Sequence, residues 1–234
     1  MKAVSPLSND PVFVLAFRTL QPPPAQPSSL LVLLHGVGGN ESNLAALGAE
    51  AGSHTLVVLP RGPITLGPTA FGWFRVAFTG NGPQIVASEA DASRRALIDF
   101  IGQLQQAHGI DAAHTVVAGF SQGGILSASV ALTAPERVAA FAVLAGRILP
   151  ELEPLLGSAD RLSALRGYIA HGTHDDKLPV SWAQRSDDWL TCLGVPHETK
   201  LYPTGHELGA PMCADFLTWL SRAERRGSRF DPAN

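Results

Sequence analysis

Short, almost wholly apolar runs alternate with longer amphipathic stretches along most of the chain. Residues 30–35, 55–60 and 114–120 are apolar at nearly every position. Such runs are typical of strands that are covered on both faces in a mostly parallel sheet. Similar patterns predict an opening strand over 12–17 and later strands over 138–146, 167–172 and 197–203.

The stretches between these runs carry the spacing of helices. Residues 88–109 repeat apolar positions at helical intervals and end at a glycine. Helices are also predicted over 41–52, 122–136 and 208–226, with a short crossover helix between 148 and 167. Strands and helices that alternate in this way predict an α/β fold, a doubly wound and mostly parallel sheet with right-handed crossovers.

Length and composition suit one soluble globular domain over residues 1–234. The chain has 45% hydrophobic and 16% charged residues, which argues against disorder. Residues 1–29 would form an N-terminal strand and a proline-rich loop. Residues 222–234, which hold a cluster of arginines, would form the end of a helix and a solvated C-terminal tail.

Charge and targeting signals exclude several classes of partner. The net charge of −3 gives no reason to expect nucleic acid or an anionic membrane surface. No run approaches the roughly 18 apolar residues of a membrane span, and the apolar run at 12–17 lacks the flanks of a signal peptide. Two cysteines are too few for a disulfide framework. We therefore expect a cytoplasmic protein with reduced thiols and without a metal or an organic cofactor.

The segment "AGFSQGG", residues 118–124, contains the pattern G-x-S-x-G around Ser121. A chain of this length contains that pattern by accident on the order of one time in ten at average glycine usage. Here, however, the motif begins where a predicted strand ends and leads directly into a predicted helix. That is the setting of a nucleophilic serine on a sharp turn; the alternative is a structural serine in a glycine-rich turn.

A serine hydroxyl needs a base within hydrogen-bond reach. His206 in "YPTGHEL" follows the last predicted strand and is the best candidate among eight histidines. The acid that orients this base is expected after the preceding strand, where "HGTHDDKLP" offers Asp175 and Asp176. The order serine, aspartate, histidine is that of α/β-hydrolases.

A second glycine-rich loop, "LHGVGGN" at residues 34–40, follows a buried strand. It is typical of loops that give a backbone amide to a developing oxyanion. We expect the amides of Val37 and Gln122 to form the oxyanion hole, with Gly38 as the second candidate in the loop. A phosphate-binding loop is the competing interpretation, but the segment matches neither standard glycine-rich phosphate motif.

The motifs "LLHGVGGNESNL", "GWF", "AGFSQGG", "HGTHDDKLP" and "YPTGHEL" occur in this order. Together they resemble the phospholipase/carboxylesterase family of α/β-hydrolases, which includes small carboxylesterases, acyl-protein thioesterases and lysophospholipases. The resemblance covers about residues 30–220. It implies an α/β-hydrolase fold without a large lid domain, and its acid motif favours Asp175 over Asp176.

Two departures from the family pattern bear on the substrate. The family's Trp-Phe-Asp triplet reads Trp73-Phe74-Arg75 here, which reverses a charge near the expected site. Arg147 in "LAGRILP" could face the rim of the pocket and bind an anion, or it could be solvated. The aromatic stretch 68–78 could form an apolar wall for an acyl chain or simply pack. We therefore expect Trp73, Phe74 and Arg147 to contact substrate.

These features predict a serine carboxylesterase that acts on a small-molecule ester of short to medium acyl chain through an acyl-enzyme. A thioesterase or lysophospholipase for longer chains would use the same residues. A peptidase of this fold and a catalytically inactive binding protein are further alternatives, while the serine excludes dehalogenase chemistry. Members of the family can form homodimers, so the resemblance leaves that state open.

Overall fold

The structure is a computed structural model that describes residues 2–79 and 82–227. A twisted sheet of eight strands runs through its centre, in the order β1-β2-β4-β3-β9-β10-β11-β12. The six strands β4, β3, β9, β10, β11 and β12 are parallel to one another. At one edge β2 runs antiparallel to β4, and β1 runs antiparallel to β2. The bounds are β1 Ala3–Val4, β2 Phe17–Gln21, β3 Ser29–Leu34, β4 Thr55–Pro60, β9 Thr115–Phe120, β10 Ala140–Leu144, β11 Arg166–Gly172 and β12 His197–Tyr202.

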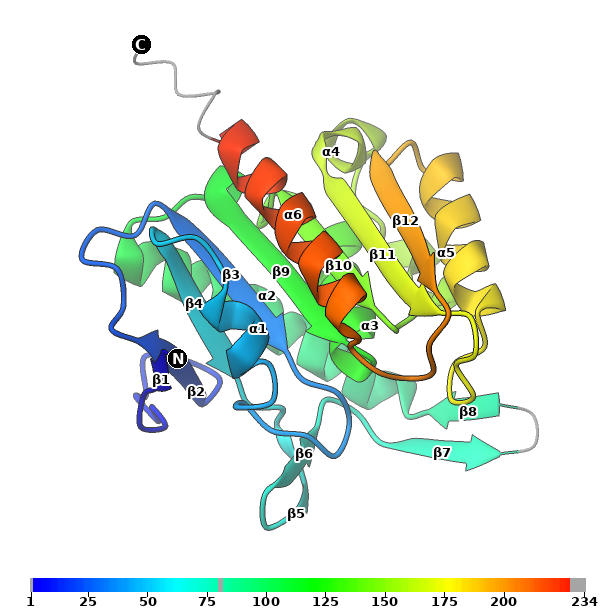
Figure 1. The fold of residues 1–234 in the computed structure, drawn as a ribbon, viewed down its shortest axis with the longest axis horizontal. Coiled ribbons are helices and arrows are strands. Elements are labelled where there is room, and N and C mark those ends of the chain that lie inside the picture. Colours follow the sequence, from blue (N-terminus) through cyan, green and yellow to red (C-terminus); the bar gives the residue numbers. More distant parts are fainter. Residues whose placement is uncertain (1, 80–81, 228–234) are drawn as a thin grey trace.

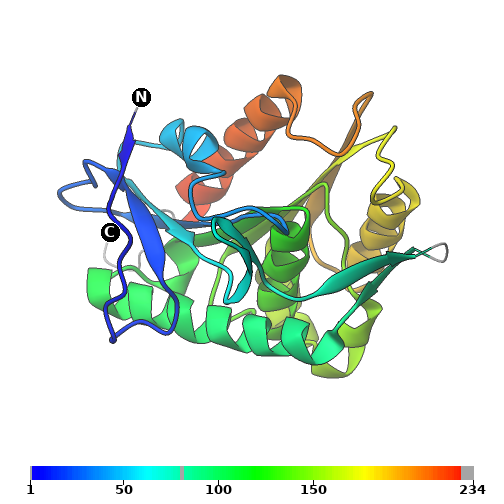
Figure 2. The same cartoon turned by 90° about the horizontal axis from the view of Figure 1, so that it is seen from below.

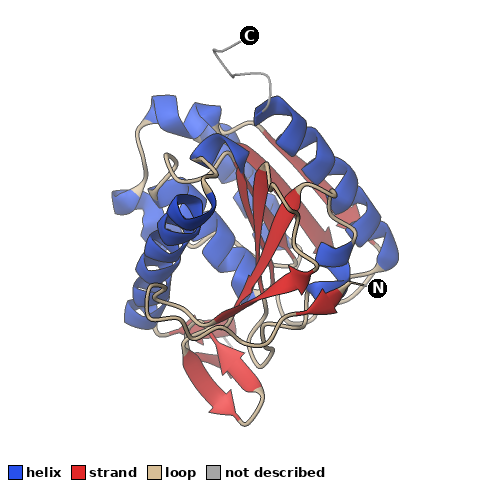
Figure 3. Ribbon diagram, turned by 90° about the vertical axis from the view of Figure 1, so that its left-hand side faces the viewer, coloured by secondary structure: helices blue, strands red, loops and turns tan. Residues whose placement is uncertain are grey.

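Helices cover both faces of this sheet, as expected of apolar strands that must be shielded from water on each side. Figure 2 shows α1 and α6 on one face and α2, α3 and α5 on the other. Seen from its edge in Figure 3, the sheet lies between these two layers. The bounds are α1 Ala45–Ala49, α2 Ala87–His108, α3 Gln122–Thr133, α4 Ala159–Ala164, α5 Ser181–Cys192 and α6 Ala210–Gly227, with 3₁₀ turns at Ala112–His114 and Pro150–Leu155. The predicted doubly wound α/β fold is confirmed.

Two hairpins lie at the end of the sheet where β3 and β9 finish (Figure 1). They are β5 Ile64–Gly67 with β6 Ala70–Gly72, and β7 Val76–Thr79 with β8 Gly82–Ile85. The sequence predicted only a loop rich in glycine, proline and aromatic residues here. Within the described ranges, no large lid domain covers this end of the sheet. None of the helices in the described part of the chain is long and apolar enough to cross a membrane.

The opening strand is displaced from its predicted position. We expected it over 12–17, but the observed strand β2 is Phe17–Gln21, and residues 11–15 form turns. The Asp10 side chain accepts a hydrogen bond from the amide of Val12 (2.9 Å), which closes a turn that a strand would not allow. Val12 and Val14 are exposed, whereas Phe13 packs edge-on against Phe17. The apolar pattern there marks residues of a turn that pack on the core, Phe13 and Leu15, rather than a strand.

The last helix lies close to its predicted position. Helix α6 continues to Gly227, so the first residues of the predicted tail 222–234 belong to it. Arg222 pairs with Glu198 of β12 at 2.9 Å. The rest of the predicted tail, residues 228–234, lies outside the described residues. Cys192 and Cys213 are free thiols.

Candidate active site

Ser121 occupies a sharp turn between β9 and α3. Its backbone has φ 53° and ψ −115°, a region that a residue with a Cβ rarely adopts. The amide of Ser121 donates to the carbonyl oxygen of Leu144 in β10 at 2.8 Å, which fixes the turn on the sheet. A Cβ on Gly123 would lie 2.0 Å from the carbonyl oxygen of Leu34, so only glycine lets the new helix start this close to β3. The strained turn raises Ser121 above the carboxyl end of the sheet.

His206 and Asp175 reach this serine from two other strand ends. The His206 Nε2 atom lies 2.9 Å from the Ser121 Oγ atom, and its Nδ1 atom lies 2.7 Å from the Asp175 Oδ2 atom. Asp175 follows β11 and His206 follows β12. Because the carboxyl ends of parallel strands meet at one edge of a sheet, three residues distant in sequence converge there.

The surroundings of Asp175 explain why it, and not its neighbour, meets His206. The Asp175 side chain is fully buried, and its Oδ1 atom accepts the amides of Lys177 (2.9 Å) and Leu178 (2.8 Å). His171 lies 3.3 Å from its Oδ2 atom. Asp176 points into solvent and pairs with Lys177. The turn after β11 therefore directs the Asp175 side chain toward His206 and the Asp176 side chain into solvent.

The loop after β3 lies opposite His206, on the other side of the serine. Gly36 and Val37 line the pocket together with Ser121 and Gln122. The amide of Gly38 donates to the carbonyl oxygen of Phe71 at 2.8 Å, so it is already engaged. The amides of Val37 and Gln122 have no such acceptor within the described residues. Of the two loop amides considered from the sequence, only that of Val37 is without a backbone acceptor among the described residues.

Buried polar groups hold this loop in place. The His35 Nε2 atom accepts the amide of Gly62 (3.0 Å), and its Nδ1 atom donates to the carbonyl oxygen of Gly36 (2.7 Å). Burial lowers the pKa of His35, because an apolar environment disfavours the charged imidazolium. Glu41 at the end of the loop accepts hydrogen bonds from Arg18 and Arg61. The guanidinium of Arg61 lowers the pKa of Glu41 from 4.5 to about 2.

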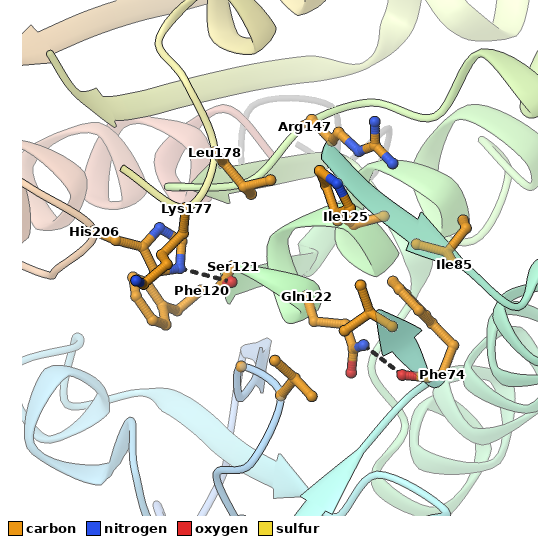
Figure 4. Close-up of a pocket in the computed structure, with 14 residues that line it drawn as sticks. Phe74, Ile85, Phe120, Ser121, Gln122, Ile125, Arg147, Lys177, Leu178 and His206 are labelled. Carbon is orange, nitrogen blue, oxygen red and sulfur yellow. Dashed lines mark hydrogen bonds between the residues drawn. The ribbon is translucent and has the colours of Figure 1, made fainter. Parts of the chain in front are cut away.

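A pocket of about 270 Å³ opens above Ser121, and most of its wall is apolar (Figure 4). Of the predicted substrate contacts, Phe74 and Arg147 line this pocket. Trp73 does not: it is fully buried, and its Nε1 atom donates to the carbonyl oxygen of His35 at 2.9 Å. Arg75 also lies outside the pocket, where its exposed side chain pairs with Glu89. The reversed charge in the family triplet is thus neutralised away from the pocket.

Several pocket residues were not predicted from the sequence. Ile125 lies four residues after Ser121 on α3, so helical spacing from the serine could have indicated it. Lys177 and Leu178 lie two and three residues after Asp175. The remaining wall comes from the hairpin of β7 and β8, through Val76, Pro83 and Ile85. No sequence signal distinguished the inward side of that hairpin. Among the residues described, no group of histidine, cysteine and carboxylate side chains is arranged to hold a metal ion.

A doubly wound sheet with a serine on a strained strand-to-helix turn, hydrogen-bonded to a histidine after the last strand, defines an α/β-hydrolase fold. The sequence model of the Phospholipase/Carboxylesterase family matches residues 17–223. The chain belongs to this family, which confirms the resemblance, and it is an α/β-hydrolase of the ester-hydrolysing type.

Individual relatives are distant but cover most of the chain. The crystal structure of a carboxylesterase from Mesorhizobium loti is 25% identical, with a TM-score of 0.77, over 93% of this chain and 98% of that one. Acyl-protein thioesterase 1 of Mycosarcoma maydis is 27% identical over 70% of this chain and 76% of its own length. Acyl-protein thioesterase 1 of Kluyveromyces lactis is 26% identical over 76% of this chain and 88% of its own.

Proposed function

We propose that the protein is a serine carboxylesterase, which hydrolyses carboxylic esters of short to medium acyl chains through an acyl-enzyme. The observation that carries this proposal is the continuous line of hydrogen bonds from Asp175 through His206 to Ser121 at the base of an apolar pocket. A buried carboxylate, an imidazole and a hydroxyl in this order supply an orienting group, a general base and a nucleophile.

In the first half of the reaction the Ser121 hydroxyl attacks the ester carbonyl and passes its proton to the His206 Nε2 atom. Asp175 accepts the Nδ1–H of His206, which leaves Nε2 free to act as the base and stabilises the imidazolium that forms. The amides of Val37 and Gln122 donate to the oxyanion of the tetrahedral intermediate. Each such donor contributes roughly 3 kcal/mol to transition-state stabilisation.

Collapse of that intermediate breaks the bond to the leaving alcohol, which takes the proton from His206. A water molecule then enters, gives a proton to the same nitrogen and attacks the acyl-enzyme carbonyl. The second tetrahedral intermediate releases the carboxylic acid and returns the proton to Ser121. The chain's own side chains and amides account for every proton transfer, so the cycle requires no cofactor.

The size and openness of the pocket support small or medium substrates. Phe74, Ile125 and Leu178 offer apolar contacts for an acyl chain, and the space above Ser121 is about 270 Å³. Each buried methylene would add at most about 0.8 kcal/mol. Chain-length preference therefore reports the depth of the acyl site directly.

The test is kcat/KM for p-nitrophenyl esters from acetyl to palmitoyl, with Ser121→Ala as the control. We expect hydrolysis with an optimum at short or medium chains, a loss of several orders of magnitude in Ser121→Ala, and labelling of Ser121 by a fluorophosphonate. Equal rates for both proteins and no labelling would refute the proposal and favour a binding protein of this fold.

Thioester hydrolysis is the second candidate, because the curated relatives above bear the name acyl-protein thioesterase 1. The same serine, histidine and amides would act on a thioester carbonyl. Comparing an octanoyl oxygen ester with the matching octanoyl thioester decides between them. A preference for the thioester that grows with acyl length would favour this candidate. The homodimer and the cytoplasmic location stay predictions.

A further inference from the structure

Arg147 lies in a tightly fixed segment that directly follows β10. The amide of Ala145 donates to the carbonyl oxygen of Ala170 at 2.7 Å, and the amide of Ile148 donates to the Ser186 hydroxyl at 3.0 Å. Between them, Gly146 packs so closely that a Cβ would lie 2.9 Å from the carbonyl oxygen of Ser121. The backbone of Arg147 is therefore held at a set position relative to Ser121.

The guanidinium of Arg147 is buried without a carboxylate in ion-pair contact among the described residues. Arg147 is only 7% exposed, and within that part of the chain its buried Nε atom has no hydrogen-bond partner. Across the described part of the chain, Arg147 forms no ion pair and donates no hydrogen bond. Its guanidinium lies over the ring of Trp182, whose centroid is 4.3 Å from the Cζ atom. Lys177, the other cation at this pocket, is exposed and paired with Asp176.

Such an arrangement opposes the stability of the fold. Burial lowers the pKa of Arg147, because desolvation outweighs the opposing effect of the Glu151 charge. A buried charge normally carries a hydrogen-bonded partner, since removing an ion from water costs several kcal/mol. The ring of Trp182 offsets only part of this cost. An anion that enters from the pocket would supply the missing partner.

The pocket has two sides with different chemistry. In Figure 4, His206, Lys177 and Phe120 lie on one side of Ser121, and Arg147, Ile125, Ile85 and Phe74 lie on the other. Because His206 must protonate the leaving alcohol, the leaving group belongs on its side. The acyl group then extends past the apolar side chains toward Arg147. Among the residues that the structure describes, no aspartate or glutamate lines this pocket.

We infer that the substrate is an ester whose acyl chain ends in a carboxylate, a monoester of a dicarboxylic acid, and that Arg147 binds this carboxylate. The inference rests on the proposed esterase activity and specifies its substrate class. The planar guanidinium offers two parallel N–H donors that match a carboxylate. The apolar wall between Arg147 and Ser121 accommodates the methylenes that separate the two ends of the acyl group.

The test compares mono-p-nitrophenyl suberate with p-nitrophenyl octanoate, which has the same number of acyl carbons but no charge. We expect the wild type to favour the suberate ester. In Arg147→Met the ratio of the two kcat/KM values should fall roughly 10- to 100-fold, the usual effect of losing a hydrogen bond to a charged group. Arg185→Met is the matched control, because Arg185 lies 5.0 Å from the same Trp182 ring and does not line the pocket.

Binding without turnover gives a second readout. Monomethyl suberate titrated into Ser121→Ala should bind by calorimetry, and the added change Arg147→Met should weaken that binding by a similar factor. Arg147→Gln, which keeps hydrogen-bonding groups but removes the charge, should behave like Arg147→Met. Neither change should lower the melting temperature, because each removes an uncompensated buried charge.

Two outcomes would overturn the inference. One is an equal loss of kcat/KM on both esters in Arg147→Met, which leaves the esterase proposal intact. The other is a melting temperature that falls in both variants with the ester ratio unchanged, which assigns Arg147 to the fold. If the wild type cleaves neither ester faster than Ser121→Ala, the proposed function fails instead, and the titration alone decides whether Arg147 binds carboxylates.

Discussion

The side chain of Gln122 donates a hydrogen bond to the carbonyl oxygen of Phe74, 2.6 Å away, across 48 residues of sequence. Its Oε1 atom accepts the amide of Trp73, also at 2.6 Å. The residue after the proposed nucleophile thus holds both the proposed oxyanion amide and the backbone of the pocket wall. The Gln122 side chain thus connects the turn that carries Ser121 to the pocket wall at Phe74.

Replacing Gln122 by alanine should therefore damage both stability and activity. Two buried backbone groups would lose their partners, at about 1–3 kcal/mol each. We expect a free energy of unfolding lowered by several kcal/mol and a reduced kcat/KM, measured by urea denaturation and ester hydrolysis. Gln184→Ala, at an exposed position of helix α5, is the matched control. A Gln122→Ala variant as stable as this control would show that the two Gln122 side-chain hydrogen bonds do not stabilise the fold.

The two adjacent aspartates offer a sharp test of the proposed catalytic role. Asp175→Asn should lower kcat about 10⁴-fold, because an amide no longer holds His206 in the required tautomer. Asp176→Asn removes the same charge one residue away, where the side chain faces solvent, and should change kcat by no more than a few-fold. Comparable losses in both variants would contradict the assignment of Asp175.

Glu41 should make the stability of the fold depend on pH in a predictable range. Its pKa falls from 4.5 to about 2 on folding, so the stabilisation is fully present above pH 4.5 and is lost as the pH falls toward about 2. The shift corresponds to about 3 kcal/mol. We expect Glu41→Gln to lower the free energy of unfolding by this order at pH 7.

The difference between wild type and Glu41→Gln should shrink as urea titrations move from pH 7 to pH 3. Glu50→Gln, which changes an exposed carboxylate, should show a small difference that does not vary in this way. A difference for Glu41→Gln that stays constant down to pH 3 would mean that Arg18 and Arg61 do not stabilise its charged form.

Ile85 lines both the main pocket and a second pocket of about 190 Å³. Ile85→Ala should join the two spaces and move the optimum of the p-nitrophenyl ester series toward longer acyl chains. Each further methylene that becomes buried would add at most about 0.8 kcal/mol. Val76→Ala enlarges only the main pocket and is the control. An unchanged optimum in Ile85→Ala would mean that acyl chains do not extend toward Ile85.

Much of the candidate site follows from order along the chain. The apolar runs predicted the strands β3, β9, β11 and β12, and parallel strands end at one edge of the sheet. Ser121, His206 and the loop at 34–40 each follow such a strand, so the sequence alone predicts that they meet. The choice between Asp175 and Asp176 needed the family resemblance, since both follow the same strand.

Only the tertiary structure decided which way neighbouring side chains point in the segment from 61 to 85. Trp73 enters the core while Phe74 faces the pocket, because Gln122 holds the backbone of both residues and the His35 carbonyl oxygen accepts the Trp73 side chain. Arg75 turns outward because its amide and its side chain both donate to Glu89. Sequence periodicity carries no information on partners that lie some fifty residues away.

The environment of Arg147 likewise depends on the tertiary structure. From the sequence alone, a solvated arginine at the rim was the main interpretation, and an anion-binding group facing the pocket was the alternative. Arg147 is buried against Trp182, away from any ion-pair partner among the described residues, because α5 packs beside the end of β10. The sequence by itself determined the fold, the family and the order of the reactive residues, because these depend on local pattern; the shape and charge of the pocket depend on which distant side chains the packing brings together.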